Sequence, residues 1–326
     1  KDVCLFLERV MLESRAWNDG REVGMQDSLS VPHVHELGAS LETGRLYRLT
    51  IRVDNRDCRQ LGTHPSAFTD ETQTIWNGII GRMELQAFEP IRIQRLQVDP
   101  DVAGRTATVR IDVCNRTARP AEMTCRIAAA ADWPRGDAAS PSARAVAERS
   151  ATLTADGLQT FEWMLDMGEE CPLWDEFDPV LHRLSVELEA DSPLGAMRDE
   201  RSLSFGMRAF GREGTQFTVN GRLTYLRGTL DCCIFPLTGY PPMDTAEWTR
   251  IYEVVKAYGL NHVRFHSWCP PEAAFEAADR IGLYLQVEGP VWMDTWNLPV
   301  GSHPEHYRYL PEEARRIVET YGHHPS

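Results

Sequence analysis

The sequence has 326 residues, a mass of 37.0 kDa and 42% hydrophobic residues, a composition typical of folded proteins that excludes a disordered chain. At roughly 150 residues per domain, this length predicts two domains or three small ones. The 34 basic and 48 acidic residues give a net charge of −14, so we expect neither nucleic acid nor a membrane as a partner. No apolar run approaches the roughly 20 residues that a membrane helix needs.

The eight cysteines include no Cys-x-x-Cys pair, which disfavours a zinc ribbon or a thioredoxin-type site. The vicinal pair Cys232–Cys233 is awkward for a disulfide. We therefore expect buried free thiols, and cysteine usage leaves the compartment open. The first residues, Lys1-Asp2-Val3, show no initiator Met and no leader, so we expect a portion of a longer chain.

The first two thirds of the chain predict strands. An apolar run at 3–7 and alternation over 46–53 indicate strands, with a turn at Asp19-Gly20. Alternation resumes at 91–96, 107–113 and 184–189, which predicts a second sandwich of immunoglobulin type. The Ala-, Ser- and Pro-rich stretch 128–151 is interpreted as a loose loop or edge region.

From about residue 207 the hydrophobic period changes. Strands are predicted at 223–228, 260–266 and 283–288, alternating with helices at 245–258, from Pro270-Pro271 to Ile281, and from Pro311 to about Gly322. Helix 245–258 places Trp248, Tyr252 and Tyr258 on one apolar stripe. Three βα units indicate a parallel α/β fold, either part of a (β/α)₈ barrel or a small open sheet, and we favour the partial barrel.

Candidate chemistry gathers after the predicted parallel strands, where barrel active sites lie. The residues at or beyond those strand ends are Asp231, Arg264, His266, Trp268, Glu288 and Trp292. Arg and His side chains hydrogen-bond hydroxyls or a carboxylate, and indole rings stack on the apolar face of a pyranose. This set predicts a sugar site.

Each of these residues also has a purely structural interpretation. Glu288 can pair with Arg264, His266 can be a half-buried histidine and Asp231 can cap a loop, while Trp268 and Trp292 can be core aromatics. The pair His33 and His35 lacks an acidic or cysteine partner, so we predict no metal site and no cofactor. Phosphate-loop and serine-hydrolase motifs are absent from the sequence.

Several segments resemble glycoside hydrolase family 2, the family of β-galactosidases, β-glucuronidases and β-mannosidases. Residues 220–228 (NGRLTYLRG) resemble the entry to its catalytic barrel, 258–264 and 278–284 its second strand and second helix, and 73–81 (QTIWNGIIG) the end of its jelly-roll domain. The resemblance implies a partial jelly-roll β-sandwich at 1–87, an immunoglobulin-like β-sandwich at 88–206, and the first three βα units of an incomplete (β/α)₈ TIM barrel at 207–326.

The resemblance also implies a retaining, exo-acting glycosidase with two catalytic glutamates about 5 Å apart. In the family these follow the fourth and seventh barrel strands, so we expect both beyond Ser326 and predict that this chain alone is inactive. Glu288 matches a pocket-lining glutamate of the family. His266 stands one place earlier than in the usual Arg-x-Ser-His motif, and Thr74 replaces an acidic residue of the β-galactosidase branch, so the substrate is left open.

The expected partner is an oligosaccharide or polysaccharide, and a homo-oligomer is possible on the family's pattern. The alternatives are a non-catalytic carbohydrate-binding protein and a structural assembly module. For the compartment we favour the periplasm or the exterior, where acidic polysaccharide-degrading enzymes often work, with the cytoplasm as the alternative.

Overall fold

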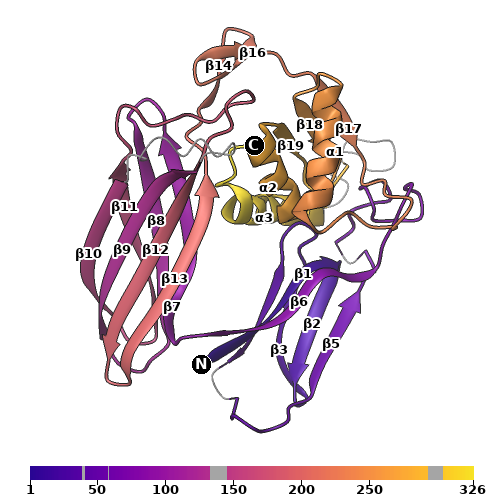
Figure 1. Ribbon diagram of the computed structural model, residues 1–326. Coiled ribbons are helices and arrows are strands. Elements are labelled where there is room, and N and C mark those ends of the chain that lie inside the picture. The colour runs from indigo at the N-terminus through magenta and orange to yellow at the C-terminus, as the bar shows by residue number, and fades with distance from the viewer. Residues whose placement is uncertain (39–40, 58, 133–144, 293–303) are drawn as a thin grey trace.

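The computed structural model describes residues 1–38, 41–57, 59–132, 145–292 and 304–326 (Figure 1). It is mostly β-sheet, and its helices gather in the last third of the chain, where they lie against a parallel sheet. None of the helices in these ranges is long and apolar enough to cross a membrane.

The N-terminal part consists of two three-stranded antiparallel sheets, with strand orders β4-β1-β6 and β3-β2-β5. Its strands are β1 (Asp2–Met11), β2 (Glu13–Asn18), β3 (Arg21–Gln26), β4 (His33–Gly38), β5 (Leu49–Asp54) and β6 (Gly78–Phe88). Leu5, Leu7 and Ala16 belong to the buried core that these sheets share. The predicted turn at Asp19-Gly20 is confirmed. Both residues have positive φ (48° and 82°), as a two-residue hairpin requires.

The strand predicted at 46–53 begins only at Leu49. Leu46 is 96% exposed, and the Arg48 backbone N–H donates to the Asp19 carboxylate at 2.8 Å instead of joining a ladder. The polar turn around Asp19 therefore captures the first residues of the alternating run.

The middle part is a β-sandwich whose sheets have the orders β11-β8-β7 and β10-β9-β12-β13. Its strands are β7 (Ile91–Asp101), β8 (Thr106–Asn115), β9 (Ala121–Asp132), β10 (Ala145–Leu153), β11 (Gly157–Asp166), β12 (Leu181–Ser192) and β13 (Gly195–Phe205). Inward-facing residues of both sheets form one core, which includes Ile93, Ile111, Ile127 and Val186. Alternation in the sequence thus predicted β7, β8 and β12, while β9, β10, β11 and β13 were not predicted.

The interpretation of 128–151 as a loop is wrong for the part that the structure describes. Residues 128–132 complete β9 and 145–151 belong to β10, while 133–144 lie outside the described residues. Ala128 and Ala129 are buried, and Ala129 belongs to the core between the two sheets. The expectation of an edge is confirmed, because β10 pairs only with β9 in the described sheet.

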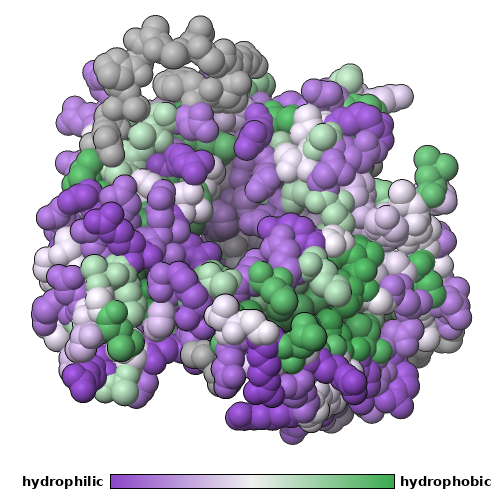
Figure 2. All heavy atoms as spheres, turned by 60° about the horizontal axis from the view of Figure 1, so that its bottom comes forward, coloured by the Kyte–Doolittle hydropathy of each residue, from purple (hydrophilic) through white to green (hydrophobic). Residues whose placement is uncertain are grey.

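A buried ion pair joins the N-terminal sheets to the sandwich. Arg92, the second residue of β7, donates to Asp2 of β1 at 2.5 Å, and both side chains are almost fully buried. Arg116 reaches the same carboxylate and also pairs with Glu36 at 2.5 Å. Beside this contact a hollow separates the two parts, and Figure 2 shows it next to an apolar area of the surface. Opposite charges from separate parts thus fix their junction at one end of the hollow.

The last third begins with a small antiparallel sheet of β14 (Phe210–Glu213), β15 (Gln216–Val219) and β16 (Arg222–Thr224). The parallel sheet that follows has the order β17-β18-β19. Its elements are β17 (Gly228–Asp231), α1 (Thr245–Ala257), β18 (His262–Phe265), α2 (Glu272–Ile281), β19 (Tyr284–Val287) and α3 (Pro304–Tyr321). The predicted strand at 223–228 is therefore corrected, because its first residues pair antiparallel with β15 and the parallel strand starts at Gly228.

Helical periodicity located α1 and α2 well. Trp248 and Tyr252 are fully buried, whereas Tyr258 is 81% exposed and is not part of the stripe. Gly259 and Gly282 follow these helices with φ of 76°, a conformation that glycine adopts without strain. Trp174 of the middle part fixes α2 further, because its buried indole N–H donates to the Asp279 carbonyl at 2.8 Å.

Helix α3 begins at Pro304 rather than at Pro311, which lies inside it. The proline removes one helical hydrogen bond, yet the turn before it persists because Tyr309 is buried against the N-terminal part. The hydroxyl of Tyr309 donates to the Asp27 carbonyl at 3.3 Å. Tertiary packing therefore overrides the break that the proline predicts.

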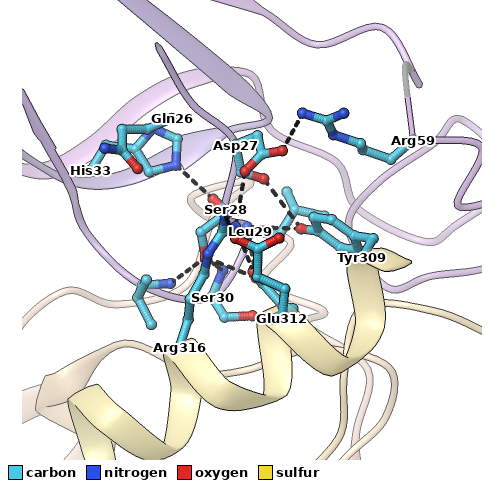
Figure 3. A network of polar contacts seen from close by, with 12 residues as sticks. Gln26, Asp27, Ser28, Leu29, Ser30, His33, Arg59, Tyr309, Glu312 and Arg316 are labelled. Atoms are coloured by element: carbon cyan, nitrogen blue, oxygen red, sulfur yellow. Dashed lines mark hydrogen bonds and ion pairs between the residues drawn. The ribbon is translucent and has the colours of Figure 1, made fainter. Parts of the chain in front are cut away.

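Figure 3 shows helix α3 beside residues 27–30 of the N-terminal part, with Tyr309 and Arg316 among the contacts between them. Glu313 of α3 is completely buried in this contact. Glu313 accepts hydrogen bonds from the Ser28 hydroxyl at 2.8 Å and from the Leu29 backbone N–H at 2.9 Å. Arg316 lies between it and Asp27, at 3.3 and 2.9 Å. Asp27 also pairs with Arg59. Each buried charge has polar partners, as burial requires.

A buried arginine of the N-terminal part also bonds to Leu29 and to the α/β part. Arg9 of β1 is 4% exposed, and its guanidinium donates to the Leu29 carbonyl at 2.7 Å and to the carbonyls of Cys269 and Pro270 at 3.0 and 2.9 Å. Those two carbonyls belong to the segment between β18 and α2. The backbone of Leu29 is therefore held at its carbonyl by Arg9 and at its N–H by Glu313.

We predict that Glu313→Ala destabilises the protein by about 2–4 kcal/mol. The buried Ser28 hydroxyl loses its acceptor, the Leu29 N–H keeps only its longer contact with the Tyr309 hydroxyl, and Arg316 loses one of its three carboxylate partners. The matched control is Glu312→Ala, one residue earlier on α3. Glu312 is half exposed and pairs only with Arg316 in the described structure, so its loss should cost under about 1 kcal/mol. Urea unfolding of both variants measures the difference, and equal destabilisation would contradict the prediction.

Candidate sugar site

The carboxyl ends of the three parallel strands lie side by side. Asp231 is in register with Phe265, and Phe265 with Val287, so the residues that follow each strand meet at one edge. The His266 backbone N–H extends this alignment by donating to the Asp231 carbonyl at 2.8 Å. The sheet thus gathers Asp231, His266 and Glu288, as their positions in the sequence predicted.

Glu288 links neighbouring strands at this edge. Its carboxylate accepts from the Arg264 guanidinium at 2.5 Å and from the Ser267 backbone N–H at 2.8 Å. Arg264 remains 44% exposed and Glu288 25% exposed, so the pair faces solvent and can exchange partners with a ligand. The structural ion pair that the sequence left open is therefore present, in a place where a sugar hydroxyl or carboxylate could reach both groups.

Asp231 closes the turn after β17, since its carboxylate accepts from the Cys233 backbone N–H at 2.7 Å. Asp231 therefore caps a loop, which is one of the two roles that the sequence left open for it. Burial raises the pKa of Asp231 from 3.8 to about 6, and the Cys233 hydrogen bond opposes only part of that shift. A carboxyl group with such a pKa can hold or release a proton near neutrality.

The side chain of His266 lies between a thiol and an indole. Its Nδ1 is 3.7 Å from the Cys232 sulfur, and its ring meets the Trp292 ring edge-on with centroids 4.8 Å apart. Trp292 is 42% exposed, so part of its surface remains available to a ligand. His266 and Trp292 therefore occupy the same side of the site.

Trp268 takes the core position that the sequence left open for it. It is 8% exposed, packs against Phe265 and Trp248, and donates its indole N–H to the Asp231 carbonyl at 3.1 Å. An indole this buried offers little surface for a sugar to stack on. Of the two tryptophans proposed from the sequence, Trp292 alone presents an exposed ring.

The N-terminal part reaches this edge through the segment between β5 and β6. Sequence reasoning linked Thr74 of this segment to the pocket but missed Ser66 and His64. Ser66 donates its backbone N–H to the Ser267 hydroxyl at 3.0 Å and its own hydroxyl to the His266 carbonyl at 2.6 Å. His64 meets Trp292 with ring centroids 5.2 Å apart. The segment has no hydrophobic period and no motif that could have revealed these contacts.

Thr74 lies in the same segment, at the position where the β-galactosidase branch has an acidic residue. Its hydroxyl donates to the Cys233 carbonyl at 2.5 Å, which ties the segment to the turn after β17. The substitution thus replaces a charged group with a structural contact.

Three residues at this junction have a left-handed backbone although they are not glycine. They are Ala67, Cys233 and Ser267, with φ of 61°, 56° and 54°. Such conformations cost of order 1–3 kcal/mol each and cluster at functional sites. Surrounding contacts maintain the strained backbone at all three residues. Strain of this kind supports the assignment of a functional site to this junction.

Within the described residues, no group of three or more His, Cys, Asp or Glu side chains could hold a metal ion. His33 and His35 are buried around the Ser14 hydroxyl, at 2.7 and 2.8 Å. Burial lowers the pKa of His33 to about 4, so this histidine is neutral near pH 7. Burial and the hydrogen bonds with Ser14 give His33 and His35 a structural role.

Curated relatives share part of the sequence, although no protein-family model matches the chain. A β-glucuronidase of Paenibacillus borealis is 30% identical over 159 residues, which is 48% of this chain and 24% of the relative. A β-galactosidase of Rhizobium meliloti is 26% identical over 264 residues, which is 79% of this chain and 32% of the relative. The chain therefore spans between a quarter and a third of the length of these proteins.

Solved structures share its fold over the full length of this chain. The crystal structure of a β-glucuronidase from Bacteroides uniformis matches with a TM-score of 0.83 at 18% identity, over 38% of its own chain. A family 2 β-galacturonidase from Eisenbergiella tayi, crystallised with galacturonate, matches with a TM-score of 0.79 at 16% identity, over 54% of its own chain. The resemblance to glycoside hydrolase family 2 is confirmed. Family 2 enzymes thus share the arrangement of sheets that positions this site.

Asp231 gives the site a pH dependence that can be measured. Its raised pKa means that the unfolded chain loses the proton first as pH rises, so folding stability falls between about pH 4 and pH 6 and stays lower above that range. We predict that Asp231→Asn, which keeps the acceptor for Cys233, stabilises the protein by up to about 3 kcal/mol at pH 8 and has little effect at pH 4.

Thermal unfolding at both pH values measures this difference. The control is Asp70→Asn, an exposed residue of the β5–β6 segment, which should leave the wild-type dependence unchanged. A stabilisation by Asp231→Asn that is the same at pH 4 and pH 8 would contradict the prediction.

Proposed function

We propose that this chain is the front part of a glycoside hydrolase that cleaves a terminal β-glycoside by an exo-acting, retaining mechanism. The observation that carries the proposal is the solvent-facing Arg264–Glu288 pair at the carboxyl edge of the parallel sheet, with His266 and Trp292 beside it. The names of the relatives, β-glucuronidase, β-galactosidase and β-galacturonidase, support the choice of reaction.

The proposal divides the chain into three domains. Residues 1–87 correspond to a partial jelly roll that binds sugar, 88–206 to an immunoglobulin-like sandwich, and 207–326 to the first three βα units of a TIM barrel. The parallel order β17-β18-β19 supports the last assignment. So does the hydrogen bond from the Leu285 N–H of β19 to the Ser326 carbonyl at 2.8 Å, since a further parallel strand would pair there.

In this proposal the residues of the chain bind the glycone rather than break the bond. Arg264 and His266 donate hydrogen bonds to its hydroxyl or carboxylate oxygens, Glu288 accepts from a hydroxyl, and Trp292 stacks on the ring. Asp231 holds the turn that carries Cys232 into the site. The acid/base and nucleophilic glutamates of a retaining mechanism lie beyond residue 326. The substrate is an oligosaccharide or polysaccharide.

The reaction can be tested on the complete gene product and on the 326-residue chain in parallel. We predict that the complete protein hydrolyses at least one of 4-nitrophenyl β-glucuronide, β-galacturonide and β-galactoside, and that the 326-residue chain hydrolyses none. Early product analysis by NMR should show the β-anomer first, as retention requires.

Glu288→Gln in the complete protein tests the proposed binding role. It should lower kcat/KM roughly 10-fold or more, because it removes the charge from the group that holds Arg264 and the Ser267 N–H. Turnover by the 326-residue chain would contradict the placement of the glutamates. If the complete protein hydrolyses none of the three glycosides yet binds the sugars, the alternative of a non-catalytic carbohydrate-binding protein replaces the enzyme.

A further inference from the structure

The exposed indole of Trp292 is held between two imidazole rings that come from different parts of the chain. His266 follows β18 and meets the indole at 4.8 Å with an interplanar angle of 73°. His64 belongs to the N-terminal β5–β6 segment and meets it at 5.2 Å with an angle of 61°. Both are edge-to-face contacts, the geometry that aromatic rings prefer. The orientation of Trp292 therefore depends on the N-terminal part as well as on the parallel sheet.

The position of His64 is itself fixed by contacts on either side. Two residues later, Ser66 hydrogen-bonds to the His266 carbonyl and the Ser267 hydroxyl. These bonds link the segment of His64 to the segment of His266, the two histidines that flank Trp292. Ala67 is buried with Trp268 and Cys233. On the other side, the Thr63 carbonyl accepts from the Thr69 hydroxyl at 2.5 Å. The Thr69–Thr63 hydrogen bond closes the loop that contains His64, and the contacts of Ser66 and Ala67 anchor this loop to the parallel sheet.

We propose that His64 is a positioning residue that orients the Trp292 indole for stacking on a sugar ring of the substrate. Through this contact the N-terminal sheets set the affinity of a site whose other binding groups lie on the parallel sheet. The inference rests on the proposed glycosidase function. It assigns to a residue of the β5–β6 segment a role in binding and none in bond cleavage.

The test compares three single variants of the complete gene product, assayed with whichever of the three 4-nitrophenyl glycosides the wild type hydrolyses best. We expect His64→Ala to raise KM roughly 2- to 10-fold, the value of one aromatic pair, with kcat within about twofold of wild type. His64→Phe keeps an aromatic edge and should restore most of the affinity. Asp70→Asn, on the same segment, should leave both constants unchanged.

A double-mutant cycle with Trp292→Ala separates positioning from direct contact. If His64 acts through the indole, the double variant should have the KM of Trp292→Ala alone. Fully additive effects of the two substitutions, an unchanged KM in His64→Ala, or a loss confined to kcat would each overturn the proposal.

Acrylamide quenching of tryptophan fluorescence gives a readout that does not depend on activity. His64→Ala should increase quenching, and this increase should disappear in a Trp292→Phe background. If the wild type hydrolyses none of the glycosides, the proposed function fails while quenching still decides the role of His64. Quenching unchanged by His64→Ala would overturn the inference in an active enzyme as well as in an inactive one.

Discussion

The arrangement of this protein depends on two buried side chains of opposite charge that both hydrogen-bond to the backbone of Leu29. Arg9 of β1 and Glu313 of α3 bond to the carbonyl and the N–H of Leu29, and Arg9 also bonds to the segment before α2. Burying a charge is unfavourable unless hydrogen bonds compensate it. Arg9 and Glu313 have all of their hydrogen-bond partners only when the N-terminal sheets and the α/β part are in contact. The N-terminal sheets and the α/β part are therefore fixed to each other in a single orientation.

That orientation brings the β5–β6 segment to the carboxyl edge of the parallel sheet. Ser66, Ala67 and Thr74 then contact the turns that carry His266, Ser267 and Cys233. The left-handed backbone at three of these positions is tolerated because packing and hydrogen bonds from both sides determine it. The site is thus a junction between parts of the chain, and its precision follows from how they dock.

The chain shares its fold with solved enzymes at low sequence identity. The shared architecture sets where strand ends and connecting segments meet. His266 stands one place earlier than in the usual family motif, and Thr74 supplies a structural hydrogen bond in place of an acidic group. Similarity at this level of identity shows the fold, and function has to be argued from the residues of the site.

Patterns local in sequence were sufficient for much of the fold. Alternation located β7, β8 and β12 of the sandwich, the 3.6-residue period located α1 and α2, and Asp19-Gly20 marked a hairpin, because each depends on residues a few positions apart. The gathering of Asp231, Arg264, His266 and Glu288 also followed from the sequence, since the ends of parallel strands meet at one edge.

Tertiary structure decided what depends on partners distant in the chain. The start of α3 ahead of Pro311 depends on the burial of Tyr309, β10 on its pairing with β9, and the core position of Trp268 on the aromatic cluster around it. His64 shows the difference most clearly. No pattern marks it, and it reaches Trp292 only because its segment is anchored to residues about 200 positions away. Hydrophobic periodicity records which face of an element is buried, whereas the identity of what covers that face depends on how the parts dock.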